Sequence, residues 1–120
     1  MTAADLTALR AAVEAERVRT KARIAALGDD FEAIVEATAE ANSDDEHDPE
    51  GATIGFERAQ ITALREQARV ELAELDAALG RLAAGTYGIC ADCDGPIATE
   101  RLLARPATTT CVACAGKHSR

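Results

Sequence analysis

Four cysteines near the C-terminus are the residues whose type and spacing best support a chemical role. They form two pairs, Cys90 with Cys93 and Cys111 with Cys114, and two residues separate the members of each pair. This gap lets two thiolates from one turn reach the same ion, and four such sulfurs supply the tetrahedron that zinc prefers. The chain has no other cysteine. We therefore predict that these four residues bind one structural zinc ion.

Other uses of the cysteines compete with structural zinc. A thioredoxin-like redox pair would need a βαβ setting, which this sequence lacks. Two disulfides would need an oxidising compartment. A catalytic zinc would need an open coordination position and a general base, whereas four cysteines close the shell. His118 follows the last cysteine and could replace a ligand, but we assign it to a polar tail.

The segment around the cysteines, residues 86–120, is predicted to form a small head. A glycine stands two places after each pair, at Gly95 and Gly116, where a positive φ would let the chain leave a tight knuckle. Between the pairs, residues 99–103 suggest one helical turn that ends before Pro106. We expect its small core to consist of the apolar residues Tyr87, Ile97, Leu102 and Leu103.

Two long helices precede the head. Residues 3 to about 41 and 54 to about 85 are rich in Ala, Leu, Glu and Arg, and each carries one narrow apolar stripe at helical spacing. Gly28 interrupts the first helix, but the stripe keeps its phase, so we predict a continuous or mildly kinked helix. Gly85 is a plausible stop for the second. Exposure of either apolar stripe to water is unfavourable, so the two helices should pair as an antiparallel hairpin that buries both stripes.

The fold class predicted from these features is mostly α, with a long antiparallel helical hairpin (coiled coil) over residues 1–85 and a zinc-ribbon-like head over residues 86–120. Residues 42–53 are rich in turn-forming types and should form the connecting loop. A turn near His47 and Asp48 would pair Phe31 with the neighbourhood of Leu64 and Val13 with that of Leu82, each within about one helical turn.

Negative charge is concentrated at this expected turn. Residues 28–53 contain ten acidic residues and no Lys or Arg. On the hairpin they would form a strongly negative tip, whose candidate partner-contact residues are Asp44, Asp45, Glu46, Asp48 and Glu50. The alternative is a solvated acidic surface without a partner.

The composition argues against several classes of function. The formal net charge is −8, so the chain lacks the positive surface that sequence-specific contact with nucleic acid requires. It has no apolar run near the ~18 residues of a membrane span and no N-terminal signal-peptide pattern. It also shows no Ser-His-Asp or Cys-His arrangement and no glycine-rich phosphate loop. We expect a cytoplasmic protein that is not an enzyme and does not bind membranes.

The spacing of residues in the head resembles the signature of the DksA/TraR zinc-finger family. The matching pattern runs Tyr87-Gly88-x-Cys90-x-x-Cys93-x-x-Pro96-Ile97-x-x-x-Arg101-Leu102-x-x-x-Pro106-x-x-x-x-Cys111-x-x-Cys114. The resemblance implies a transcription regulator that binds RNA polymerase directly, without reading DNA, and inserts an acidic coiled-coil tip into the secondary channel. The alternative is a zinc-stabilised helical interaction module with a different protein partner.

Two features depart from the family pattern. The family tip often reads Asp-Pro-x-Asp-x-Ala, and here Asp48 and Pro49 match while Gly51 and Thr53 do not. Family members also often carry a helix after the last cysteine, and only six residues follow Cys114. We therefore expect that helix to be missing.

Overall fold

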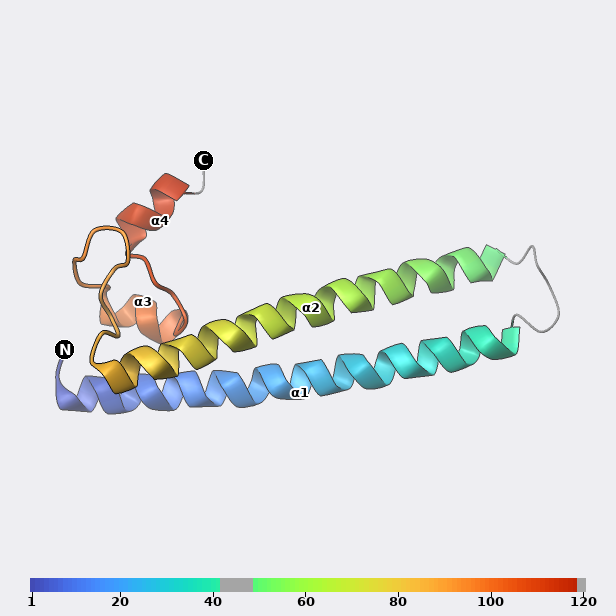
Figure 1. The fold of residues 1–120 in the computed structure, drawn as a ribbon, viewed down its shortest axis with the longest axis horizontal. Helices are drawn as coiled ribbons and strands as arrows, with labels where there is room; N and C mark the ends of the chain where they lie inside the picture. The colour runs from blue at the N-terminus through green and yellow to red at the C-terminus, as the bar shows by residue number, and fades with distance from the viewer. Residues whose placement is uncertain (42–48, 119–120) are drawn as a thin grey trace. The chain divides into compact units, whose positions relative to one another are not determined.

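Helices make up most of the chain in a computed structural model, which describes residues 1–41 and 49–118. The four helices are α1 (Ala3–Ala41), α2 (Pro49–Ala84), α3 (Thr99–Ala104) and α4 (Val112–His118) (Figure 1). The described residues contain no strand beyond a single bridge. None of their helices is long and apolar enough to cross a membrane. The fold is thus the predicted helical hairpin followed by a four-cysteine head.

The first helix is continuous across Gly28, as its uninterrupted apolar stripe predicts. It begins with a reciprocal capping pair, in which the backbone N–H of Asp5 donates to the Thr2 hydroxyl and the backbone N–H of Thr2 donates to the Asp5 carboxylate, both at 3.0 Å. These bonds satisfy donors that the first helical turn would otherwise leave unpaired. The backbone hydrogen bond from Thr2 lowers the pKa of the Asp5 carboxyl.

The second helix begins at Pro49, whereas the sequence suggested residue 54. Proline suits the first turn of a helix because its missing N–H has no partner there, so the turn-forming composition misled the prediction. The other end is as predicted. Gly85 has a φ of 77°, and the backbone N–H groups of Gly85 and Thr86 bond to the carbonyls of Leu82 and Arg81. This pair of bonds is the Schellman motif that ends helices at glycine.

The chain divides into two compact units, which we name the head unit (residues 1–18 and 71–120) and the helix-pair unit (residues 19–70). Both α1 and α2 contribute to each unit. In the head unit, Arg17 on α1 forms an ion pair with Asp76 on α2, with 2.6 Å between Nε and Oδ1.

The helix-pair unit joins α1 and α2 in a register that agrees with the prediction to within about one helical turn, since Gly28 of α1 meets Arg65 of α2. The guanidinium of Arg58 lies over the ring of Phe31, 5.6 Å from its centroid, and Leu64 is 45% exposed. The guanidinium of Arg65 packs across Gly28. The antiparallel order holds, since the lower-numbered residue of α1 meets the higher-numbered residue of α2. Two arginines, Arg58 and Arg65, thus contact α1 in addition to the apolar residues of the predicted stripe.

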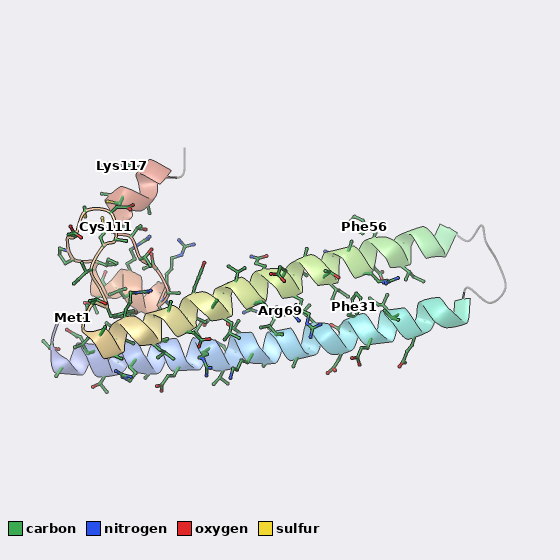
Figure 2. All side chains as sticks on the ribbon, viewed as in Figure 1. Met1, Phe31, Phe56, Arg69, Cys111 and Lys117 are labelled. Atoms are coloured by element: carbon green, nitrogen blue, oxygen red, sulfur yellow. The ribbon has the colours of Figure 1, made fainter. Side chains whose placement is uncertain are left out.

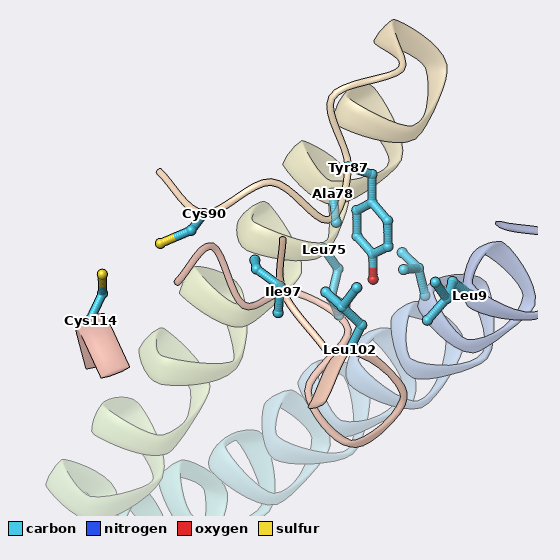
Figure 3. Packing of buried hydrophobic residues seen from close by; sticks show 9 residues of the cluster. Leu9, Leu75, Ala78, Tyr87, Cys90, Ile97, Leu102 and Cys114 are labelled. Atoms are coloured by element: carbon cyan, nitrogen blue, oxygen red, sulfur yellow. The ribbon is translucent and has the colours of Figure 1, made fainter. Parts of the chain in front are cut away.

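The core lies in the head unit, where the ends of the long helices meet the head (Figure 3). Tyr87, Ile97 and Leu102 pack there with residues of α1 and α2, and the complete buried cluster is Leu9, Val13, Leu75, Ala78, Tyr87, Cys90, Ile97, Leu102 and Cys114. Leu103, predicted as core, is 49% exposed. Adjacent residues of a helix point about 100° apart, so α3 turns Leu102 inward and Leu103 outward.

Candidate metal centre

The four cysteine sulfurs converge on one point. All four lie within 4.8 Å of one another, and the sulfurs of Cys93 and Cys111 are 3.9 Å apart. Four sulfurs bound to zinc at about 2.3 Å would form a tetrahedron with edges of about 3.8 Å. Figure 3 shows the sulfurs of Cys90 and Cys114 facing each other. The donor type and the spacing of this cluster therefore fit one zinc ion.

A tight hairpin of residues 88–97 positions the first pair. The backbone N–H of Cys90 donates to the carbonyl of Gly95 at 2.8 Å, and Ile89 bridges to Pro96 in antiparallel fashion. The turn closes through a bond from the Asp94 N–H to the Cys90 carbonyl. Short backbone bonds thus bring Cys90 and Cys93 to the same side of the loop.

The glycines after each cysteine pair do not play the predicted role. The positive φ belongs to Asp94, at 59°, and neither Gly95 nor Gly116 has one. A Cβ on Gly95 would lie 3.3 Å from the Cys93 sulfur, so a larger residue there would crowd this sulfur. Gly116 lies inside α4, where a Cβ would meet nothing within 4 Å. The two half-sites therefore resemble each other in sequence but not in conformation.

A short helix positions the second pair. Cys111 immediately precedes α4, its carbonyl accepts a hydrogen bond from the Ala115 N–H at 2.9 Å, and Cys114 is buried within the helix. This helix continues beyond Cys114, so the expectation that no helix follows the last cysteine was wrong. Six residues suffice because α4 starts between the two cysteines.

Arg101 links α3 to the segment that leads into Cys111, a role that sequence reasoning did not assign to it. Its Nε donates to the Thr110 carbonyl at 2.8 Å, and its Nη2 donates to the Thr108 hydroxyl at 3.3 Å. Tyr87 donates from its hydroxyl to the Pro106 carbonyl at 2.8 Å, at the start of the same segment. The sequence could have pointed to this role of Arg101, because Arg101 is one of the residues that match the family pattern.

The local electrostatics favour ionised sulfur at one position and oppose it at another. The backbone N–H of Cys111 donates to the Cys90 sulfur at 3.4 Å, and this bond is the main reason that the pKa of the Cys90 thiol falls to about 6. The thiol of Cys111 and burial raise the pKa of Cys114 to about 12. Four neighbouring thiols cannot all ionise without a cation, and a divalent metal supplies the missing charge.

The structure does not describe the side chains of the acidic residues proposed as a tip. Asp44, Asp45, Glu46 and Asp48 lie outside the described residues. Glu50 belongs to the first turn of α2, where only the backbone is described.

Comparison with known proteins agrees with the geometry of the cysteine cluster. Residues 85–120 match the family model of the prokaryotic dksA/traR C4-type zinc finger. The C-terminal segment belongs to this zinc-finger family. As a C4 finger it holds one zinc ion, and because four sulfurs leave no open position the zinc is structural.

Relatives extend the similarity beyond the finger. RNA polymerase-binding transcription factor DksA from two strains of Caulobacter vibrioides (NA1000 / CB15N and ATCC 19089 / CIP 103742 / CB 15) is 36% identical over 64 residues, which are 53% of this chain and 45% of each relative. The match therefore spans less than half the length of these curated relatives. The solved structure of transcription factor DksA2 from Pseudomonas aeruginosa aligns with a TM-score of 0.81 at 26% identity and covers 99% of this chain and 86% of that one.

Proposed function

We propose that this protein regulates transcription by binding RNA polymerase directly, and that Cys90, Cys93, Cys111 and Cys114 are the ligands of its structural zinc. The observation that carries the proposal is the likeness of nearly the whole chain, helices and finger together, to transcription factor DksA2. The relatives from Caulobacter are named for RNA polymerase binding, which supports the same partner here.

Within this proposal, the zinc is structural and takes no part in a reaction. The metal ties the hairpin of the first cysteine pair to α4, and the same head residues, Tyr87, Ile97 and Leu102, pack on Leu9 and Leu75 of the long helices. Zinc binding therefore stabilises the surface formed by the finger and the helix ends in the head unit. A surface held in one shape loses less conformational entropy when a partner binds.

The finer part of the proposal concerns the acidic tip. We propose that the coiled-coil tip enters the secondary channel of RNA polymerase and presents carboxylates near the active centre. The resemblance to the family and the ten acidic residues within residues 28–53 support this placement. A magnesium-bearing active centre is a hard cation site and favours oxygen ligands, so carboxylates there would act on the metal or on its ligands.

A pull-down of the RNA polymerase from the organism's own extract tests the function. The wild-type protein should retain the polymerase subunits, and a variant with Asp45→Asn and Asp48→Asn should retain them equally while losing its effect on transcript yield. If neither protein retains polymerase, the proposed function is wrong. If the variant regulates normally, only the tip mechanism is wrong.

The alternative is a zinc-stabilised interaction module for a different protein. Phe56 favours it, because this residue is 71% exposed and its side chain points away from α1 (Figure 2). A partner that binds through such apolar helix residues would be lost on Phe56→Ser and unaffected by neutralising the tip.

A further inference from the structure

The two units differ sharply in how much side chain they bury. The head unit contains Leu9, Val13 and Leu102 with no exposed surface. In the helix-pair unit, the only buried residues among those described are Thr20 and Ala68. Hydrophobic stabilisation scales with the apolar area removed from water, so the helix-pair unit gains much less from packing than the head unit.

The larger apolar side chains of the helix-pair unit remain partly or largely in solvent. Its half-buried members are Ile24, Leu27, Phe31, Ile34, Ile54 and Ile61. Four others are exposed, namely Val35 at 37%, Phe56 at 71%, Leu64 at 45% and Val70 at 51%. The seam between α1 and α2 is therefore thin, and no described side chain longer than threonine is fully covered within it.

Polar groups weaken this seam further. The Nε of Arg65 is buried and has no hydrogen-bond partner among the described residues, and a buried unpaired donor is destabilising. The same guanidinium packs on Gly28, where a Cβ would come within 3.0 Å of Nη2. Glycine in a helix interior is itself unfavourable. Arg65 thus occupies a seam position that leucine fills one and two heptads later on α2, at Leu72 and Leu79.

We propose that the helix-pair unit opens and re-forms as a separate cooperative unit while the head unit stays folded. Most helical stability in proteins comes from tertiary packing and not from intrinsic propensity, so the segments of α1 and α2 in this unit lose helix once they separate. Local opening of this kind is expected where buried apolar contacts are few. A partner that binds the closed pair must hold it shut, so its affinity depends on this equilibrium.

Native-state hydrogen exchange of the full-length, zinc-loaded protein tests the proposal. Backbone amides of residues 20–36 and 54–69 should exchange at least about tenfold faster than those of residues 9–13 and 75–78 under conditions where exchange reports opening equilibria. Equal protection in the two sets would mean that the protein opens only as a whole, and the proposal would be overturned.

Two glycines of α2 provide a matched pair of variants. Gly55 lies in the helix-pair unit and Gly80 in the head unit, both are exposed, and a Cβ at either meets nothing within 4 Å. Each change to alanine should lower the equilibrium constant for opening of its own helix segment about fivefold, because alanine favours the helix more than glycine does. Gly80→Ala should slow exchange in the head unit and leave the helix-pair unit unchanged. Gly55→Ala should slow both, because global unfolding includes the helix-pair unit. Slower exchange in the helix-pair unit of Gly80→Ala would contradict separate opening.

Arg65→Leu tests the cause. An apolar side chain removes the unpaired Nε and fills the seam, so exchange in the helix-pair unit should become about tenfold slower. Faster exchange in this variant would show that the guanidinium stabilises the pair, and the thin polar seam would no longer explain the opening.

Discussion

Replacing Arg101 tests how the second cysteine pair is held in place. Arg101→Met keeps much of the side-chain volume and removes the bonds to the Thr110 carbonyl at 2.8 Å and the Thr108 hydroxyl at 3.3 Å. A hydrogen bond from a charged donor contributes about 1.5–3 kcal/mol. The second bond is long and Arg101 is only half-buried, so we expect a total loss of about 2 kcal/mol. The segment that leads into Cys111 would then be less ordered before zinc binds.

This loss should appear as weaker zinc binding. A change of about 1.4 kcal/mol is tenfold in an equilibrium constant, so the expected effect is a Kd raised roughly 10- to 100-fold, the range typical of residues that orient metal ligands. Competition against a chromophoric chelator measures it. Arg105→Met is the matched control, because it removes the same charge from an exposed side chain of the neighbouring segment. Equal zinc affinity in the two variants would refute the role of Arg101.

Three further predictions concern the core, the zinc and the tip. Leu102→Ala should destabilise the protein by about 2–5 kcal/mol because it empties a fully buried position, whereas Leu103→Ala should change the free energy of unfolding by less than about 0.5 kcal/mol; chemical denaturation measures both. Removing zinc with a chelator should preserve most of the helical circular dichroism, since α1 and α2 also pack in one buried cluster through Leu9, Val13, Leu75 and Ala78; loss of most of it would show that residues 1–85 are not a separable domain. Asp45→Asn with Asp48→Asn should leave the melting temperature nearly unchanged and abolish the effect on transcription in vitro.

The sequence was most informative where local chemistry alone decides the structure. The paired spacing of Cys90 and Cys93 with Cys111 and Cys114 predicted one cluster, and the structure brings the four sulfurs together. The apolar period predicted a continuous α1, and Gly85 predicted the end of α2, because a glycine stop acts on its own helix turn.

The features that sequence reasoning missed depend on tertiary contacts. Gly95 lies close to the Cys93 sulfur and the positive φ falls on Asp94, so composition alone pointed to the wrong residue. The packing of the Arg65 guanidinium across Gly28 is a tertiary contact that an apolar period cannot reveal. The role of Arg101 requires residues that are distant along the chain to meet. The division of the chain at residue 85 stays a prediction.

Direct binding of the purified, zinc-loaded protein to purified RNA polymerase tests the central claim. Analytical ultracentrifugation or fluorescence anisotropy with a labelled chain would measure the affinity and the stoichiometry. We predict saturable binding that is weakened when zinc is removed. The absence of a complex at micromolar concentrations of both proteins would contradict the proposed function.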